Sequence, residues 1–491
     1  MKIMKKSVLM TVCVSMMIPM LAACTKANQS DDKTERVLRI ATSMGYSAND
    51  EWFRQRFTEL FEFANPNIKL EILTTQDERF MYGRPDPNTK PEDPMEKMKK
   101  LMEGDNPPDV VMVGYEQLPE LISSNMLTQL DPMITKDKFD TSDIVPAVLE
   151  GLKKVGDGKL YALAPNFGSS ALIYNKKMFD EAGAPYPKDK MTWEETMELA
   201  RRLVKGEGES RKYGFSFSTH NMGENMFYAA QMMSAPLELR MYDEKGEKMT
   251  VDNPSWEKVW NAALQWKNEK LIPGPIDYNA MRNRSMDQEN FNPFQGDDFL
   301  SGRVAMSIIH YGQLDQIVNA NKSAQNIKGF TPIDWDVVTV PVHQEAPDVG
   351  GQMYMDGIMS INAKAQNVQD AWKFIKFING EEYAKLKSSS SNYIVSRKKY
   401  IKPKNGVEFN IAAFTTLTPV MNQQFDNKLY REKPGIVQVN EIAYRTFEEV
   451  SQGKLSVKDG LKKWQTEGDA LLQSLKDNPN GPARDQGMMM R

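Results

Sequence analysis

Strand-like and helix-like hydrophobic patterns alternate along the chain from residue 37 onward. Residues 37–40 and 109–113 are short apolar runs, and apolar and polar residues alternate strictly over 68–72. Large apolar residues recur at helical spacing over 52–61 and over 94–102, where Asp-Pro supplies an N-cap and a first helical position. This βαβαβ order predicts an α/β fold with a twisted, open, mostly parallel sheet.

Ligands of such sheets bind beyond the carboxyl ends of the strands. The residues expected there are Ser43 to Tyr46 after the first strand and Gly114 to Glu116 after the third. Tyr46, Tyr115 and Glu116 are therefore candidate binding residues.

A second alternating region follows. Two strand-like runs, 159–164 and 170–174, flank a break at Pro165–Gly168 that could carry the chain from one lobe to another. Thr192 and Glu195 have the spacing of a capping box at a helix start. Residues 371–378 and 456–475 predict amphipathic helices near the C-terminus. The chain length exceeds what one hydrophobic core supports, so at least two lobes are expected.

The N-terminus has the pattern of a secretory signal peptide over residues 1–23. Lys2, Lys5 and Lys6 precede an uncharged apolar segment that ends in small residues and is too short for a membrane span. The run Leu21-Ala-Ala-Cys24 resembles a bacterial lipobox, which implies that Cys24 is acylated and becomes the mature N-terminus. Residues 24–35 are polar and predict a flexible tether. The folded part is thus expected at the extracellular face of the cell membrane, held only by lipid.

Charge and cysteine content narrow the class of protein. Removal of residues 1–23 takes away three lysines and no acidic residue, which leaves 59 basic and 66 acidic residues. This balance does not favour nucleic acid binding, which depends on clustered Lys and Arg. With Cys24 acylated and Cys13 removed, no thiol remains for a disulfide or a metal site. The three histidines have no zinc-ligand spacing, so neither a cofactor nor a metal is expected.

Several separate runs share the order and spacing of a known family. They are Lys159-Leu-Tyr-Ala-Leu-Ala164, Ala171-Leu-Ile-Tyr-Asn175, the Phe-Asp-Glu-Ala-Gly run at 179–183, Thr192-Trp-Glu-Glu195, Phe299-Leu-Ser-Gly-Arg-Val-Ala-Met306 and Trp335-Asp-Val-Val-Thr-Val-Pro341. In these runs, which cover nearly the whole mature chain, the sequence resembles the extracellular solute-binding proteins of the maltose-binding type.

The resemblance implies a two-lobed periplasmic-binding-protein-like fold, each lobe an open α/β sheet, with the ligand between the lobes. It places residues 36–164 and 341–385 in the first lobe, and 168–335 and 386–478 in the second, followed by a flexible tail over 479–491. Crossings between the lobes are expected at 164–168, at 336–341 and near Leu386. The implied partner is the permease of an ABC importer, and a monomer is expected.

The expected ligand is a carbohydrate, because aromatic rings and hydrogen-bonding side chains fall at presumed cleft positions. The set is Tyr46, Tyr115, Glu116, Asn166, Phe167, Tyr311, Trp335, Tyr354 and Asp356. Many family members carry a sugar-stacking Trp after the Ala-Met element. Here Ala305-Met306 leads to Tyr311 instead, and Tyr311 is expected to take over the stacking.

Other functions stay open at this point. A non-sugar solute such as a peptide, a polyamine or an anion is the main alternative, and Arg282 and Arg284 lie in a segment without a predicted position. A surface glycan-processing enzyme or an adhesin comes next, although no catalytic motif supports an enzyme: Gly214-Phe-Ser-Phe-Ser218 fails the GxSxG pattern. The segments 75–94 and 272–298 resemble insertions at the cleft, with no role that the sequence decides.

Overall fold

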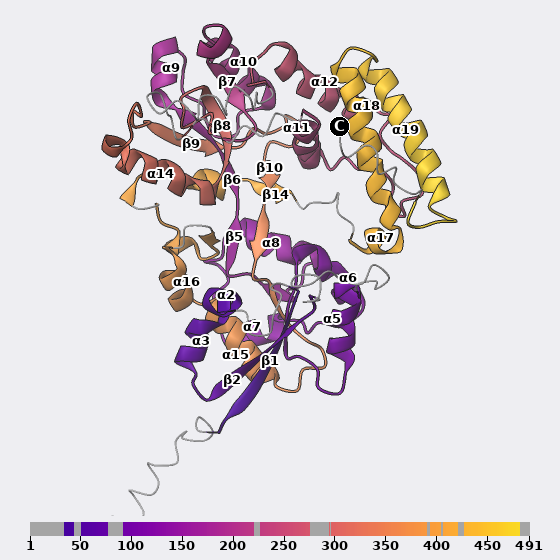
Figure 1. Ribbon diagram of the computed structural model, residues 1–491. Coiled ribbons are helices and arrows are strands. Elements are labelled where there is room, and N and C mark those ends of the chain that lie inside the picture. Colours follow the sequence, from indigo (N-terminus) through magenta and orange to yellow (C-terminus); the bar gives the residue numbers. More distant parts are fainter. Residues whose placement is uncertain are drawn as a thin grey trace, which may run out of the picture.

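A computed structural model describes residues 34–43, 51–76, 92–219, 226–274, 294, 296–389, 393–403, 406–420 and 427–481. The residues outside these ranges include the predicted signal segment, Cys24, most of the predicted tether, Tyr46, Arg282, Arg284 and most of the segments 75–94 and 272–298. The described chain forms two α/β lobes, one above the other, joined by strands that run between them (Figure 1). This is the predicted fold class.

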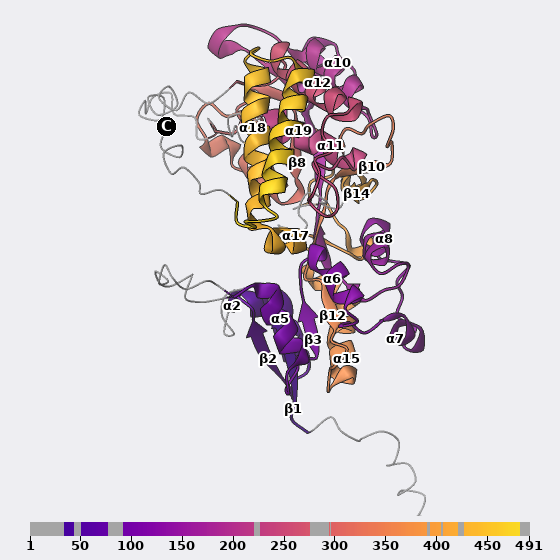
Figure 2. The ribbon, with the colours of Figure 1, turned by 90° about the vertical axis from the view of Figure 1, so that its right-hand side faces the viewer.

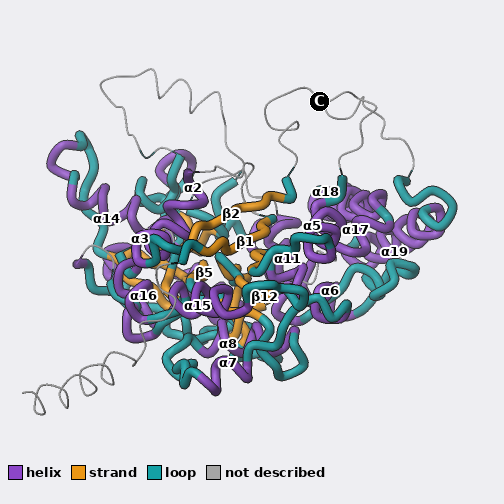
Figure 3. Tube along the Cα trace, turned by 90° about the horizontal axis from the view of Figure 1, so that it is seen from below, coloured by secondary structure: helices purple, strands orange, loops and turns teal. Residues whose placement is uncertain are grey.

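Lobe 1 is built on a five-stranded sheet in the order β2-β1-β3-β12-β4. Its strands are β1 (Arg36–Thr42), β2 (Ile68–Thr74), β3 (Val110–Met112), β4 (Ala162–Leu163) and β12 (Met359–Ile361). Its helices are α2 (Glu51–Phe53), the π-helix η1 (Arg54–Thr58), α3 (Glu59–Ala64), α5 (Pro94–Glu103), the 3-10 helix η2 (Tyr115–Gln117), α6 (Leu118–Ser123), α7 (Asp131–Lys136), α8 (Pro146–Val155), α15 (Val368–Ile378), α16 (Glu381–Lys387) and η7 (Lys398–Tyr400). Seen from below, the strands lie centrally among these helices (Figure 3).

Local sequence signals explain these elements. The strand β1 pairs in parallel with β2 and β3, as the apolar runs predict. Asp93 caps α5, because its side chain accepts hydrogen bonds from the backbone N–H groups of Met95 and Glu96. The capping box of Thr192 and Glu195 forms at the start of the helix that follows. These predictions from sequence are confirmed.

Lobe 2 is built on a four-stranded sheet in the order β7-β8-β6-β9. Its strands are β6 (Ser170–Asn175), β7 (Tyr213–Ser216), β8 (Val304–His310) and β9 (Trp335–Thr339). Its helices are α9 (Lys176–Ala182), α10 (Trp193–Leu203), η3 (Gly208–Ser210), α11 (Met226–Ser234), η4 (Ala235–Leu237), α12 (Pro254–Asn268), η5 (Tyr311–Gln313), α14 (Leu314–Lys322), η6 (Ala324–Asn326), η9 (Ile411–Phe414), α17 (Asn427–Glu432), η10 (Pro434–Val437), α18 (Gln438–Ser451) and α19 (Val457–Ser474).

The two faces of the lobe 2 sheet belong to different cores. Ala171 and Ile173 of β6 join a core that continues through the crossing strands into lobe 1. Leu172 and Tyr174 point to the opposite face and join a core formed with α10, α11, α12, α18 and α19. This alternation follows from the two-residue period of a strand. The first core therefore connects the lobes, while the second belongs to lobe 2 alone.

A three-stranded sheet in the order β11-β5-β13 marks the junction of the lobes. Its strands are β5 (Asn166–Gly168), β11 (Tyr354–Asp356) and β13 (Ile394–Val395). The central strand β5 pairs antiparallel with both neighbours. Phe167 at its middle is fully buried. We call these three strands the hinge sheet.

The second and third crossings differ from the boundaries predicted by resemblance. The expected crossing at 336–341 is wrong, because β9 pairs with β6 along its length and Val342 pairs with Thr192 of lobe 2. The strand β10 (Val349–Gln352) likewise pairs with β14 (Thr418–Val420) beside lobe 2. The chain crosses at β11 instead.

The third crossing comes later than Leu386. The backbone N–H of Lys398 donates to the carbonyl of Asp143, and the Arg397 guanidinium donates to the carbonyls of Asn379 and Asp140. Residues 394–400 thus contact lobe 1. The backbone N–H of Asn410 donates to the Asp336 carboxylate in lobe 2, so the chain crosses between residues 400 and 410.

Within the described ranges, no helix combines the length and the apolar character that a membrane span requires.

Candidate functional site

The carboxyl ends of the parallel strands in the two lobes face one another. The strand β1 begins at the end of lobe 1 far from lobe 2, and β2 and β3 run parallel to it, so all three strands end toward lobe 2 (Figure 1). In lobe 2, β6 begins directly after the hinge sheet and pairs antiparallel with β8, so β8 ends at the hinge. The strand β7 runs parallel to β8. This is the position where open α/β sheets bind ligands.

Polar side chains occupy the strand ends of lobe 1. Ser43 Oγ lies 3.2 Å from Gln117 Oε1, and Gln76 Nε2 donates to the Ser43 carbonyl at 2.9 Å. Glu116 is exposed, and its carboxylate lies beside Gly114. Tyr115 is half-buried and donates its hydroxyl to the Gly151 carbonyl at 2.7 Å, and burial raises its pKa to about 12. These residues present hydrogen-bonding groups at one rim of the site.

An aromatic cluster lies where α2, β11 and the segment before β13 meet. The guanidinium carbon of Arg56 lies 4.1 Å from the ring centroid of Tyr393 and 4.8 Å from that of Trp52. Tyr354 meets Tyr393 edge to face, with 6.0 Å between centroids. Trp52 and Tyr354 are 49% and 50% exposed. We call Trp52, Arg56, Tyr354, Tyr393 and Asp356 the aromatic array.

Asp356 fixes the position of Arg56 in this array. The guanidinium approaches both oxygens of the buried carboxylate, with Nη2 2.8 Å from Oδ1 and Nε 3.3 Å from Oδ2. Burial raises the pKa of Asp356 above its usual value, and Arg56 acts against that rise. Burial would lower the pKa of Arg56, but the charge of Asp356 and the hydrogen bonds to Arg56 outweigh this effect, so the pKa of Arg56 is raised. The raised pKa of Arg56 favours the ion pair, whereas the raised pKa of Asp356 opposes it. The geometry decides between them, because two contacts from one guanidinium to both carboxylate oxygens are typical of an ionised pair.

Backbone geometry supports a functional role for this region. Arg56 lies within the π-helix η1, which separates α2 from α3. Short π-helical turns are rare in proteins, and those that occur are often found at functional sites. Gly168 lies under the Tyr354 ring, so close that a Cβ there would clash with the ring carbons. The hinge strand β5 therefore needs glycine at this position to seat Tyr354.

Lobe 2 contributes a polar pair next to the hinge. Ser170 Oγ lies 2.7 Å from His310 Nδ1, where β6 and β8 pair. The His310 side chain is exposed, yet the surrounding protein desolvates it enough to lower its pKa. A neutral imidazole and a hydroxyl can each donate and accept hydrogen bonds, as sugar hydroxyl groups do.

Three aromatic residues predicted as ligand contacts are buried instead. Phe167 is fully buried in the hinge sheet. Tyr311 and Trp335 are 4% and 6% exposed, and their rings pack against Phe414 and Phe409 at 5.4 and 5.5 Å between centroids. A ring that is almost wholly buried has no free face to stack on a sugar, so in this conformation these residues serve packing.

The other predicted site residues divide between exposed and supporting positions. Tyr354 and Glu116 are exposed, and Tyr115 is half-buried. Asn166 is buried on β5 and pairs with Asp356 in the backbone register of β11. Asp356 supports Arg56 from beneath rather than facing solvent. Tyr46 lies outside the described residues.

Trp52, Arg56 and Tyr393, the other members of the aromatic array, are not among the residues predicted from sequence. Trp52 fits the helical apolar pattern of 52–61, which predicts a core position. Arg56 and Tyr393 belong to no motif. The available signal was the position of Trp52 close after the first strand, where ligand contacts are expected.

Among the residues that the structure describes, no three His, Cys, Asp or Glu side chains are placed to hold a metal ion.

The fold and the facing strand ends define a two-lobed solute-binding protein. The family profile of bacterial extracellular solute-binding proteins matches residues 45–385. The chain therefore belongs to this family, and it is a solute-binding protein of the ABC importer type.

Known proteins are similar to this chain in sequence or in fold. A binding protein of Brucella abortus is 22% identical over 432 residues, which cover 87% of this chain and 92% of that protein. The arabinooligosaccharide-binding protein of Bacillus subtilis is 24% identical over 273 residues, which cover 54% of this chain and 56% of that protein. An open-conformation crystal structure of a sugar transporter from Rhizobium etli superposes with a TM-score of 0.60 at 19% identity, covering 88% of this chain and 99% of that one.

Proposed function

We propose that this protein captures a carbohydrate between its two lobes and, as a monomer, delivers it to an ABC importer. The observation that carries the proposal is the aromatic array, in which Trp52 and Tyr354 expose about half of their surface beside the hinge. Sugar rings have apolar C–H faces that pack on aromatic rings. The similarity to the arabinooligosaccharide-binding protein supports the same solute class.

Polar groups at the strand ends of both lobes would satisfy the sugar hydroxyl groups. Gln117 and Glu116 lie at the strand ends of lobe 1, and Ser170 and His310 lie at the hinge end of lobe 2. A hydroxyl that loses water needs such a partner, because an unsatisfied buried polar group costs about 1–3 kcal/mol. Contacts from both lobes to one ligand would favour the closed arrangement.

An anionic solute is less favoured by this site. Arg56, the cation of the aromatic array, is already neutralised by Asp356 at 2.8 Å. Binding an anion at Arg56 would place it beside a buried carboxylate of the same charge. A neutral ligand with apolar ring faces meets no such repulsion.

A thermal-shift screen tests the solute class. A ligand that binds only the native state stabilises it by about 2.7 kcal/mol at a hundredfold excess over Kd. We expect oligosaccharides to raise the unfolding temperature, with a panel of amino acids, short peptides, polyamines and inorganic anions as the comparison. Stabilisation by a compound of the comparison panel, and by no glycan, would contradict the proposal.

We further propose that Cys24 anchors the protein to the outer face of the membrane. Acyl chains supply the membrane affinity in such an anchor, so Cys24→Ser should move the protein from the detergent phase to the aqueous phase in a phase-partition experiment. The matched control is Cys13→Ser, which alters the other cysteine of the chain and should leave partitioning unchanged. A Cys24→Ser protein that still partitions with detergent would exclude this anchor.

A further inference from the structure

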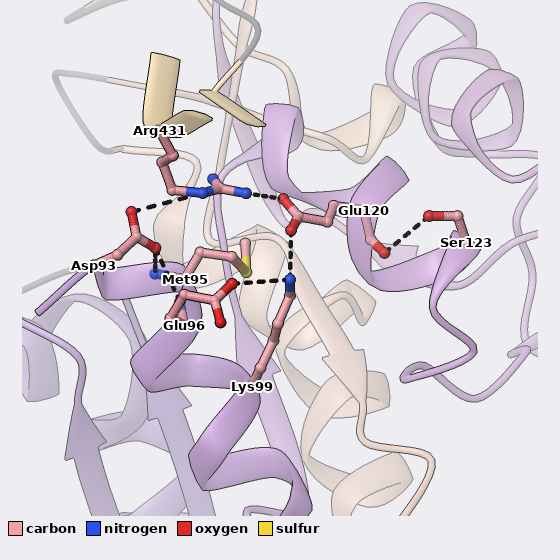
Figure 4. A network of polar contacts seen from close by, with 7 residues as sticks. All are labelled: Asp93, Met95, Glu96, Lys99, Glu120, Ser123 and Arg431. Atoms are coloured by element: carbon pink, nitrogen blue, oxygen red, sulfur yellow. Dashed lines mark hydrogen bonds and ion pairs between the residues drawn. The ribbon is translucent and has the colours of Figure 1, made fainter. Parts of the chain in front are cut away.

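A charged network joins the two lobes away from the hinge sheet. Arg431 of α17, in lobe 2, reaches the carboxylates of Glu120 on α6 and Asp93 at the start of α5, both in lobe 1 (Figure 4). In Figures 1 and 2, α17 lies directly above α5 and α6, to one side of the hinge strands in Figure 1. This bridge between the lobes is thus separate from the hinge sheet.

Contacts within lobe 1 hold the two carboxylates that Arg431 meets. Asp93 caps α5 with Oδ1, which leaves Oδ2 to face Arg431 Nε at 3.6 Å. Lys99 holds Glu120 from the other side, with Nζ 2.6 Å from Oε1. Burial would raise the pKa of Glu120, but hydrogen bonds from Lys99 and Arg431 outweigh it and lower the pKa. Contacts within lobe 1 therefore orient both carboxylates toward Arg431.

The lobe 2 side is fixed as well. Leu429 of α17 is buried in the core of lobe 2. Lys433, just after α17, donates to the carbonyls of Lys245 and Gly246 in the same lobe. Because α17 is held to lobe 2 by these contacts, Arg431 would move with lobe 2 in a hinge motion.

We infer that Arg431 is a latch that holds the lobes together at the rim away from the hinge sheet. Hinge opening would separate Arg431 from Glu120 and Asp93, while the contacts within each lobe would stay. The network is partly buried on both sides, so solvent screens it less than a surface pair. By contrast, Lys154 and Glu238 also join the lobes but are exposed and 3.5 Å apart, and such pairs contribute little.

Small-angle scattering of the purified chain without added solute tests the latch. We expect Arg431→Gln to raise the radius of gyration at low ionic strength, by shifting the ratio of bridged to open molecules about fivefold toward the open form. Glu120→Gln should act in the same direction, and the double variant should add little to either single variant. Salt at about 1 M, where the Debye length is about 3 Å, should move the wild-type profile toward that of Arg431→Gln.

Arg445→Gln is the matched control, because Arg445 pairs with Glu467 entirely within lobe 2. It should leave the scattering profile unchanged. Circular dichroism of all variants should match the wild type. A folded Arg431→Gln protein with the wild-type radius of gyration would overturn the latch. The experiment uses no ligand, so its outcome is independent of the proposed sugar binding.

Discussion

Trp335→Ala should lower the free energy of unfolding by about 3–5 kcal/mol, the usual cost of deleting a large buried aromatic ring. Trp335 begins β9, opposite Asn175 of β6, and its ring packs against Phe409. Only 6% of its surface is exposed. Truncation would therefore leave a cavity where lobe 2 meets the segment that returns from lobe 1. Urea denaturation monitored by circular dichroism measures the loss.

Trp52→Ala is the control for this prediction, since the same change at a half-exposed ring removes far fewer buried contacts. Its free energy of unfolding should fall by a much smaller amount. If Trp335→Ala unfolds at the wild-type urea concentration, Trp335 does not pack as the structure indicates. The hypothesis from sequence that Trp335 stacks on sugar would then regain support.

Local signals in the sequence predict much of each lobe. These signals depend on residues only a few positions apart in the sequence. Examples are the capping box of Thr192 and Glu195 and the alternation of apolar and polar residues in β2. The order of these elements indicates an α/β fold. The arrangement of the two lobes, by contrast, was predicted from the family resemblance.

The crossings could not be predicted because they depend on distant pairing. The apolar run 335–342 suits a sheet strand and a crossing strand equally well. Its place is decided by β6, which pairs with β9 across a long sequence separation. The hinge sheet likewise joins β5 to β11 and β13, and no local pattern encodes such contacts.

The burial of Tyr311 and the exposure of Trp52 could not be predicted for a related reason. Tyr311 directly follows the end of β8 near the hinge, where an exposed ring is expected, but Phe414 from a later segment packs against it. Trp52 shares a helical pattern with Phe53 and Phe57, which are buried, while Trp52 is half-exposed. The π-helix η1 changes the angular spacing along this segment. A pattern based on ideal helical spacing therefore assigns Trp52 to the core.

Trp52→Ala and Tyr354→Ala should each weaken sugar binding at least tenfold, or about 1.4 kcal/mol. The two rings are the half-exposed members of the aromatic array, and the Arg56–Asp356 ion pair holds the array in place between them. Aromatic anchors that lose water on binding dominate recognition energies. Because both rings are already half-exposed, their removal should leave the fold intact. Calorimetry with the glycan that gives the largest thermal shift measures the affinity.

Phe63→Ala provides the matched comparison for this experiment. Phe63 lies on α3 in the same lobe and is 90% exposed, but it belongs to no part of the aromatic array. Its truncation removes an exposed aromatic ring and should leave affinity at the wild-type value. Wild-type affinity in both Trp52→Ala and Tyr354→Ala would show that the ligand does not stack on the array. A loss in those two variants alone would separate ring stacking beside the hinge from any general effect of removing a surface aromatic residue.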